Sequence, residues 1–529
     1  MLWNAWQNEH VAPAVTGAVV STTAKNVGIA DKSWVKTPPL PGVAQQIVVD
    51  NNEKSRFIEV KTDVLDVLID KQGGSIVQAK LLKYDQNPRE KNTQPFKLLS
   101  SDAADYYVAQ SGVMDQTNKP TIHYQTSQNS YVLTPGQKEL VVKLVGHNPQ
   151  SILVDKQFVF KPDDYQILVN YKLLNQGRSP WQGRIFSQLQ QKKPEVTHSL
   201  FNISAYTGGA ISTQEKPYQK ISFEKMGEGL SLATQNGWAA MLQHYFLSAW
   251  VPPTGQTHQF YSAAQNGIYT LGILGPSIQL TPGQSYSQQL KLYTGPDVLD
   301  RLKAVAPHLD LTVDYGILWF ISMALFWLLK QIYQIVGNWG WAIVILTVLI
   351  KLAFYHLSAK SYRSMAAMRN LQPRLAALKA RYGDDRQKLT QETMALYKAE
   401  KVNPLGGCLP ILVQIPVFIA LYWMILESVE LRQAPFILWI RDLSVKDSYY
   451  ILPILMGVTM FIQQKLNPPP ADPTQAKVMQ FLPIFFTALF LNFPAGLVLY
   501  WVVNNTLSIL QQWFITYRYE MEISRKKKR

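Results

Sequence analysis

Trp339 to His356 reads Trp-Gly-Trp-Ala-Ile-Val-Ile-Leu-Thr-Val-Leu-Ile-Lys-Leu-Ala-Phe-Tyr-His, an apolar run that contains one cation, Lys351. Because about 20 apolar residues cross a bilayer, the run predicts a membrane span. A lysine at the centre of a span costs roughly 3 kcal/mol, so Lys351 needs water, a partner or the membrane surface. Thr347 lies one turn earlier on the same helical face.

Two interpretations of Lys351 remain open from these residues. The side chain can snorkel, because it lies only about 8 Å of helix rise from the end of the run and a lysine stem can carry its ammonium to the headgroups. Alternatively, Lys351 faces a wet cavity inside a bundle of helices.

The 529-residue chain divides into two parts of different character. Residues up to about 310 are polar and mixed, whereas the sequence from Leu311 onward contains repeated runs that are too apolar for soluble core helices. The formal net charge is +15, and its basic residues cluster beside the apolar runs, which favours membrane topology over nucleic-acid binding as the reason. The single cysteine, Cys408, excludes an intrachain disulfide.

The first part predicts a linker followed by an all-β sandwich. Residues 1–46 form an N-terminal remnant and a flexible linker, because Pro, Ala, Val, Thr and Lys recur there without periodicity. In residues 47–300, short runs typical of strands alternate with turn signals such as Asp70-Lys71-Gln72-Gly73-Gly74. These residues contain no His-Glu-x-x-His, Gly-x-Ser-x-Gly or P-loop lysine motif, which favours a binding or spacer domain over an enzyme.

The second part predicts a membrane α-helical bundle with five spans. Tyr315 to Tyr333 either crosses the membrane or lies flat as an interfacial helix, and the flat orientation keeps the topology consistent. Lys and Arg outnumber acids in the segment between the first two spans and in the C-terminal tail, which places these two segments in the cytoplasm. With five crossings, the β domain then lies outside the cytoplasm. The predicted order is an interfacial helix at 311–336, a span at 337–356, a cytoplasmic helical hairpin at 357–402, four spans within 403–517 and a basic tail at 518–529.

The hairpin has its own pattern. Apolar residues between Met365 and Leu378 recur at spacings of three and four, which predicts one stripe on one helix. Gly383 is expected to end that helix, and Asp384 is expected to cap the next one.

The polar residues of the predicted spans are mostly neutral. No Asp or Glu lies inside a predicted span, which disfavours an ion-driven carrier. Gln414, Asn504 and Asn505 stand out, and on the last helix Tyr500 shares a face with Asn504 while Trp501 shares the adjacent face with Asn505. Each Asn either joins two helices by a hydrogen bond, worth about 0.6 kcal/mol, or lines a wet groove for polar backbone.

The second part contains five long motifs in this order: Gly337–Trp341, Tyr397–Pro410, Val429–Phe436, Tyr450–Gly457 and Phe493–Trp501. Together they resemble the YidC membrane protein insertase family, of the Gram-negative type with a large periplasmic domain. The resemblance implies an inner-membrane insertase and chaperone that has a hydrophilic groove, needs no cofactor or metal and is not an enzyme.

The resemblance also implies site residues. The positively charged groove residue of the family corresponds to Lys351, where bacterial members usually carry arginine, and Thr347, Tyr500 and Trp501 fall at substrate-contacting positions. With the neutral amides of the predicted spans added, the expected groove residues are Lys351, Thr347, Gln414, Tyr500, Trp501, Asn504 and Asn505. The expected ribosome-contacting or lipid-contacting residues are Arg525, Lys526, Lys527, Lys528 and Arg529.

The expected partners are nascent membrane proteins, the Sec translocon, the ribosome and anionic lipids, for a chain that acts as a monomer. Family members begin with a signal-anchor helix, whereas Met1 to Gln7 is a short, tryptophan-rich stretch followed by acidic and polar residues, so truncation at this end is expected. Two alternatives remain from the residues themselves, a small-solute transporter and an envelope enzyme whose β domain acts on glycans.

Overall fold

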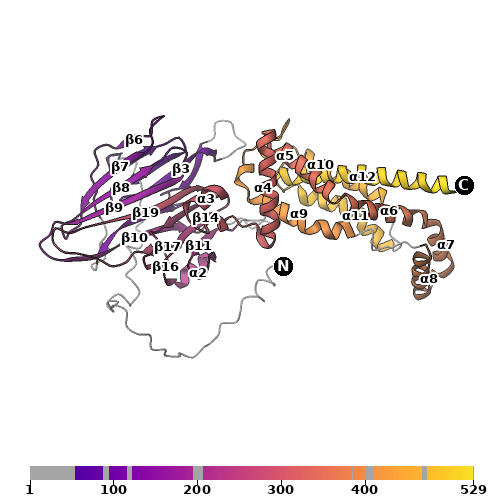
Figure 1. Ribbon diagram of the computed structural model, residues 1–529, viewed down its shortest axis with the longest axis horizontal. Helices are drawn as coiled ribbons and strands as arrows, with labels where there is room; N and C mark the ends of the chain where they lie inside the picture. Colours follow the sequence, from indigo (N-terminus) through magenta and orange to yellow (C-terminus); the bar gives the residue numbers. More distant parts are fainter. Residues whose placement is uncertain are drawn as a thin grey trace, which may run out of the picture. The chain divides into compact units, whose positions relative to one another are not determined.

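The computed structural model describes residues 54–86, 94–115, 122–194, 206–383, 385–400, 409–467 and 473–527. The predicted linker at 1–46 lies outside the described residues. Figure 1 shows a β-rich part that is followed along the chain by a helical part.

The strands carry the labels of Figure 1. Their bounds are β1 Phe57–Lys61, β2 Leu65–Asp70, β3 Ser75–Asp85, β4 Pro95–Leu99, β5 Tyr107–Asp115, β6 Ser130–Val132, β7 Leu140–His147, β8 Ile152–Phe160, β9 Gln166–Asn175, β10 Trp181–Lys192, β11 Gly208–Ser212, β12 Gln219–Ile221, β13 Ser231–Thr234, β14 Trp238–Gln243, β15 Phe246–Val251, β16 His258–Gln265, β17 Ile268–Leu274, β18 Ile278–Leu280 and β19 Ser285–Pro296.

These strands form two sheets, which confirms the predicted all-β sandwich. One sheet has the order β13-β16-β17-β10-β5-β3-β2-β1-β6, with β18 beside β10 and β4 beside β3, and the other has the order β12-β11-β14-β15-β19-β9-β8-β7. Strands such as β7 alternate buried and exposed residues, because successive side chains point to opposite faces of a sheet. The buried faces of the two sheets form the core of the domain.

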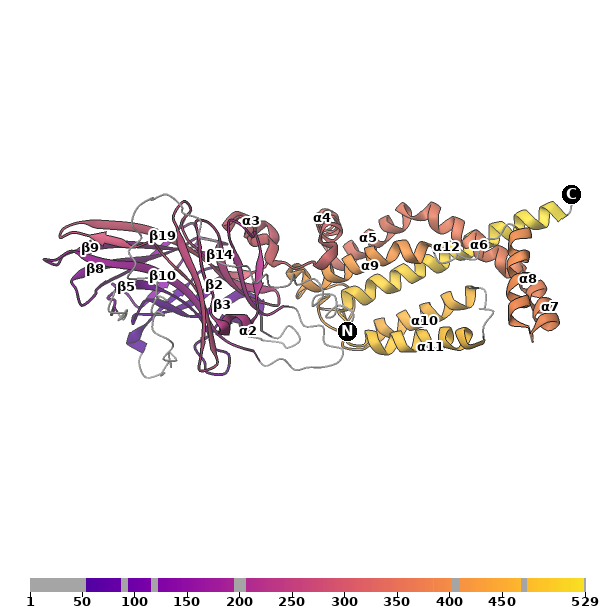
Figure 2. The same cartoon turned by 90° about the horizontal axis from the view of Figure 1, so that it is seen from below.

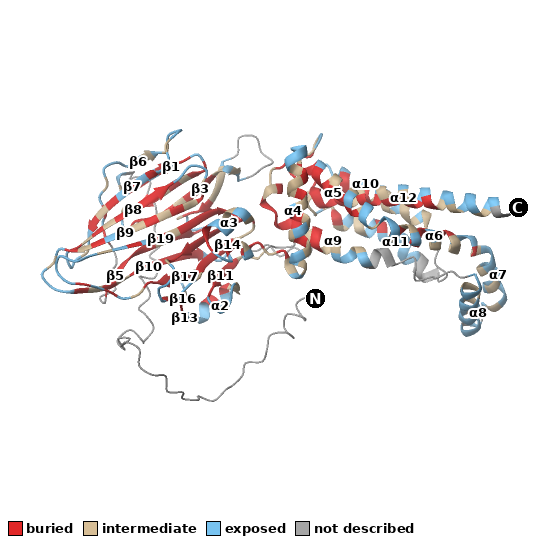
Figure 3. Ribbon diagram, in the orientation of Figure 1, coloured by how far each residue is buried: buried red, intermediate tan, exposed pale blue. Residues whose placement is uncertain are grey.

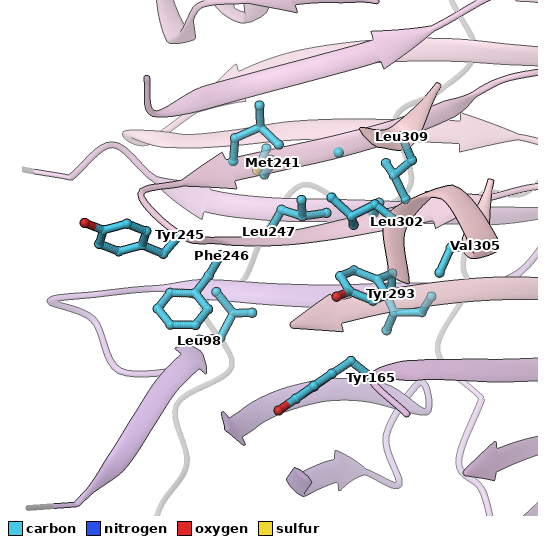
Figure 4. Packing of buried hydrophobic residues seen from close by; sticks show 14 of the residues in the cluster. Leu98, Tyr165, Met241, Tyr245, Phe246, Leu247, Tyr293, Leu302, Val305 and Leu309 are labelled. Atoms are coloured by element: carbon cyan, nitrogen blue, oxygen red, sulfur yellow. The ribbon is translucent and has the colours of Figure 1, made fainter. Parts of the chain in front are cut away.

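Two short helices belong to the β domain, α2 at Phe223–Glu228 and α3 at Leu299–Val305. Leu302 of α3 is fully buried, and Figure 4 shows it beside Leu247 of β15 and near Tyr293 of β19. The α3 helix therefore extends the sandwich core just before the chain enters its helical part.

Lys156 of β8 is a buried cation in this core. Its Nζ donates hydrogen bonds to the carbonyl oxygens of Gly74, at 2.6 Å, and Ser111, at 2.8 Å, which belong to the other sheet and its turns. Burial lowers the pKa of Lys156 well below its usual value, because the charged amine loses its hydration. The side chain thus bridges the sheets as a largely desolvated amine.

The contribution of Lys156 to the stability of the β domain is therefore expected to rise with pH between its lowered pKa in the folded domain and its pKa in the unfolded chain. In the unfolded chain, Lys156 binds its proton up to about pH 10.4, whereas the folded domain lowers that pKa. Between the two pKa values the unfolded state binds more protons, so the free energy of unfolding rises by up to about 1.4 kcal/mol per pH unit. Pulse proteolysis in urea at several pH values measures this slope. Lys156→Met is expected to reduce it, and an unchanged slope in that variant would contradict the assignment.

The helical part comes after the β domain in the chain. Its helices are α4 Trp319–Val336, α5 Trp339–Ala353, α6 Tyr355–Asn370, α7 Gln372–Tyr382, α8 Arg386–Ala399, α9 Leu409–Glu427, α10 Ile451–Leu466, α11 Pro473–Phe490 and α12 Ala495–Lys527. Helix α10 packs against both α11 and α12, and Figure 2 shows α10 and α11 side by side.

A bend marks the end of the predicted span at 337–356. Helices α5 and α6 meet at Phe354 with a bend of 68°. The predicted hairpin at 357–402 therefore divides in two: α6 packs against α12, whereas α7 and α8 pack against each other.

The prediction of one continuous helix up to Gly383 was wrong, because the chain breaks at Leu371. Pro373 lies in the first turn of α7, where its missing N–H costs no hydrogen bond. Gly383 does come directly after the end of α7. The cap of α8 is Asp385, whose side chain accepts from the Lys388 N–H, one residue later than expected.

The C-terminal part also differs from the prediction. Helix α12 continues to Lys527, so the predicted basic tail at 518–529 is largely a continuation of the last helix rather than a separate segment. The sequence from Arg518 to Lys527 contains no Pro or Gly that would end the helix. Figure 3 shows that the C-terminal end of α12, like α7 and α8, is mostly exposed.

The helix predicted at 311–336 begins only at Trp319, after short 3₁₀ turns. Among the described residues, Gly316–Val336 is long and apolar enough to cross a membrane, and the bent pair of α5 and α6 passes the same test as one unit. Parts of α9, α10 and α11 form shorter apolar helices. Length alone does not choose between a crossing and a flat α4, so the number of spans stays a prediction.

Candidate functional site

Six helices of the bundle, α5, α6 and α9 to α12, line a cavity of about 350 Å³, which we call the groove. Its lining is both polar and apolar. The polar members are Lys351, Ser358, Ser361, Tyr362, Gln414, Gln463, Gln464, Asn467, Tyr500, Trp501, Asn504, Asn505 and Ser508, and the apolar members are Met365, Ile415, Phe418, Met460, Met479, Leu482 and Pro483.

Lys351 lies in the last turn of α5 and points into the groove. Its Nζ donates to the Ser508 hydroxyl of α12 at 2.8 Å, and that hydroxyl donates to the Asn504 carbonyl at 2.7 Å. No Asp or Glu belongs to the described lining of the groove. The geometry therefore favours the groove-facing interpretation of Lys351 over snorkelling, with a hydroxyl rather than a carboxylate as its neighbour.

The neutral amides of the groove join neighbouring helices. Gln414 of α9 donates from Nε2 to the Asn504 side-chain oxygen at 2.7 Å, and Asn505 donates from Nδ2 to Thr459 of α10 at 3.3 Å. Both interpretations of the asparagines hold together, because each forms an interhelical hydrogen bond and also lines the groove.

Aromatic rings gather beside Tyr500 and Trp501. The Phe418 ring of α9 lies 5.0 Å from Trp501 and 6.5 Å from Tyr500, centroid to centroid. The Trp501 N–H and the Gln464 side-chain oxygen are buried without a hydrogen-bond partner among the described residues. A buried polar atom without a partner is costly, so these atoms favour a polar ligand in the groove.

One expected groove residue lies elsewhere. Thr347 is buried, does not line the groove, and donates its hydroxyl to the Ile343 carbonyl of its own helix at 2.7 Å. A hydroxyl that bonds to the preceding turn has no donor left for a ligand. The other six expected residues, Lys351, Gln414, Tyr500, Trp501, Asn504 and Asn505, all line the groove.

The sequence interpretation missed other groove residues. Ser358, Ser361 and Tyr362 lie three and four residues apart on α6, a spacing that marks one helical face, but the predicted boundaries place that segment in the hairpin. Gln464 comes directly after Ser448 to Gln463, which is one of the four spans predicted within 403–517. In both cases the polar pattern is present in the sequence, and the predicted boundary is misplaced.

The basic C-terminal residues are only partly described. Arg525 belongs to the exposed end of α12. The side chains of Lys526 and Lys527, and the whole of Lys528 and Arg529, lie outside the described residues. Their expected role in ribosome or lipid contact stays a prediction.

A polar groove with a lysine, among helices whose outward faces carry exposed apolar residues, is typical of a helical membrane protein, here with a β sandwich attached. Residues 57–328 match the family model of the YidC periplasmic domain, and residues 331–522 match that of the 60Kd inner membrane protein. The chain belongs to the YidC family of membrane protein insertases. It is therefore an inner membrane protein with a periplasmic β domain, and its family consists of insertases rather than enzymes.

Relatives match along almost the whole chain. The membrane protein insertase YidC of Legionella pneumophila strain Corby is 52% identical over 538 residues, which cover 99% of this chain and 96% of the relative. A protein of the same name from Coxiella burnetii is 46% identical over 546 residues, which cover 100% of this chain and 96% of the relative. A crystal structure of an active YidC insertase covers 86% of this chain and 92% of its own, with 18% identity and a TM-score of 0.39.

Proposed function

We propose that the groove receives a hydrophilic segment of a nascent membrane protein, while the apolar segment that flanks it passes into the lipid. Lys351 compensates for an acidic side chain of the segment, and no covalent bond is made or broken. The observation that carries this proposal is the Lys351 ammonium, which faces a cavity with amide and hydroxyl groups in its lining and contacts a serine hydroxyl instead of a carboxylate.

The two kinds of lining suit the two parts of such a substrate. Polar backbone is costly to move into an apolar medium unless hydrogen bonds replace its water, and the amides and hydroxyls of the groove offer such bonds. On the apolar side, Met365, Met460 and Met479 contribute flexible thioether side chains that adapt to different apolar partners. This combination supports a polypeptide substrate of variable sequence.

The proposal includes a topology and partners. Five crossings, with α4 lying flat, place the C-terminus in the cytoplasm together with the α7–α8 pair. The chain acts alone as a monomer or beside the Sec translocon. The exposed α7–α8 pair and the basic end of α12 contact the ribosome or anionic lipids, which is supported by their excess of Lys and Arg.

A small-solute transporter is the second candidate. Carriers driven by protons or sodium use intramembrane carboxylates, and the described groove lining contains none. The lack of a carboxylate therefore supports the insertase over the carrier.

Reconstitution of the purified chain tests the proposal. A short single-span protein with an acidic translocated end is synthesised in the presence of liposomes that contain the chain, and insertion is scored by protection from protease. Insertion well above that of empty liposomes is expected. Equal protection in both kinds of liposome would contradict the insertase function of this chain on its own.

Replacing both members of the amide pair is expected to lower insertion several-fold with little change in stability. The double variant Gln414→Leu and Asn504→Leu removes both partners of one hydrogen bond, so neither is left as an unpaired amide. The free energy of unfolding should therefore change little. The groove, however, loses polar atoms for the substrate. Thr506→Val is the control, because Thr506 is an exposed residue of α12 outside the groove lining. Equal insertion by the double variant and the control would contradict the role of the amides.

A further inference from the structure

We call residues 428–450, the segment between α9 and α10, the outer loop. Hydrogen bonds join it to the first residues of two helices, α5 and α12. The Asn338 side chain donates to the Pro435 and Phe436 carbonyls at 3.2 Å, and the Ala495 and Gly496 N–H groups donate to the Val445 and Leu443 carbonyls at 2.7 and 2.9 Å. Its conformation is thus fixed by the first turns of α5 and α12.

The tip of the outer loop exposes apolar side chains on strained backbone. Leu438 is 83% exposed and has φ +55°, a left-handed conformation that a leucine rarely adopts. Ile437 and Tyr449 are also exposed. Because strain and exposed apolar surface are both costly in water, this tip is built to contact an apolar phase or partner.

Beside the tip lies a hollow of about 270 Å³ with two cations, Arg441 and Lys446, in its lining. Neither cation forms an ion pair within the part of the chain that the structure describes; the Lys446 ammonium lies 6.0 Å from the centre of the Tyr450 ring. The outer loop therefore presents two positive charges next to exposed apolar side chains.

The hollow also contains two carboxylates, Asp442 and Asp447, and neither forms an ion pair with Arg441 or Lys446 among the described residues. Asp447 accepts from the Trp439 indole N–H at 3.0 Å and from the N–H groups of Tyr449 and Leu452. Asp442 accepts at Oδ1 from the Ser444 N–H and hydroxyl, whereas its Oδ2 is buried without a hydrogen-bond partner among the described residues. The charge of Asp442 also acts on Arg432. The positive charges of Arg441 and Lys446 thus remain available for a ligand from outside.

We infer that the outer loop binds the headgroup phosphate of an anionic phospholipid, with Arg441 and Lys446 as its ligands and the Leu438 tip inserted among the acyl chains. The inference rests on the proposed function in one respect, that α9 and α10 lie in the membrane. Leu438, Arg441 and Lys446 line the same hollow, and an anionic phospholipid combines an anion with apolar chains in one molecule. The outer loop also joins two apolar helices whose ends reach the membrane surface.

Fluorescence quenching in vesicles tests the inference. A bimane probe is attached at Ile437→Cys in a Cys408→Ser background of the full chain, and quenching by phosphatidylglycerol with brominated acyl chains is compared with quenching by brominated phosphatidylcholine. Each basic residue near a membrane surface favours an anionic lipid about fivefold. We therefore expect a preference for phosphatidylglycerol on the order of fivefold or more, which falls towards one in the double variant Arg441→Gln and Lys446→Gln.

Two controls isolate the site. The double variant Lys161→Gln and Lys172→Gln removes the same charge from exposed positions of the β domain and is expected to keep the preference. A probe at Val132→Cys, an exposed residue of β6, is expected to show little quenching by either lipid.

The inference would be overturned by equal quenching with the two lipids, by no quenching at residue 437, or by a preference that survives the loss of both cations. Binding of soluble glycerol phosphate by Arg441 and Lys446 without quenching at residue 437 by either brominated lipid would identify a free-phosphate site and overturn the lipid inference as well. The assay involves no insertion, so a chain that fails to insert and still shows the preference would contradict the proposed function alone.

Discussion

Lys351→Glu is expected to lower insertion of a substrate with an acidic translocated end at least about tenfold. At a separation of 4 Å in a partly solvated site, two unit charges interact by about 4 kcal/mol, and the substitution turns this attraction into repulsion. Lys351→Arg keeps the charge and should support insertion, whereas Lys351→Ala should show an intermediate loss. Protease accessibility of the substrate is measured in cells depleted of their own insertase.

Lys360→Glu is the matched control for Lys351→Glu. Lys360 is an exposed residue of α6 outside the groove lining, so the same change of charge should leave insertion close to that of the parent. If Lys351→Glu and Lys360→Glu insert the substrate equally well, the charge in the groove has no role. A substrate whose acidic residues are replaced by neutral ones should be less sensitive to Lys351→Glu.

Gly237→Ala is expected to destabilise the β domain by about 3 kcal/mol or more. Gly237 precedes β14 with φ +134°, and a Cβ at this position would lie 1.9 Å from the carbonyl oxygen of Ser212, whose strand pairs with β14. The backbone itself must move, because the clash involves no flexible side chain. For a domain of this size the loss lowers Tm by roughly 6–12 °C, which a thermal unfolding scan of the purified chain measures.

Gly255→Ala separates the clash from the effect of a positive φ. Gly255 has φ +79°, but a Cβ there meets no atom within 4 Å. Its replacement should cost only the conformational strain, about 1 kcal/mol. Equal values of Tm for the two variants would contradict the packing argument at Gly237.

The sequence was sufficient to predict most of the α12 residues that line the groove. Tyr500, Trp501, Asn504 and Asn505 are spaced so that they form two adjacent faces of one helix, and all four line the groove. Thr347 shows the limit of this reasoning. Spacing places it near Lys351 on α5, but packing buries it away from the groove, and its hydroxyl bonds to its own helix.

The contribution of α6 could not be predicted from hydropathy. Ser358 and Tyr362 reach the groove because the chain bends by 68° at Phe354 and α6 then packs against α12. Such a bend depends on tertiary packing, and the sequence around Phe354 contains no proline or glycine that would predict it. Short strand-forming runs between turn signals likewise predicted the strands of the β domain. The pairing of β10 with β5 and β17 could not be predicted in this way, because it depends on contacts that are distant in sequence.

Site-specific photocrosslinking tests most directly whether a hydrophilic segment enters the groove. A photoreactive amino acid is placed at Ile415, which lines the groove, or at Val458, an exposed apolar residue of α10 outside the groove lining, and a substrate is arrested during insertion. The account predicts a crosslink from Ile415 to the hydrophilic segment and little or none from Val458. No crosslink from Ile415, or equal crosslinks from both positions, would contradict it.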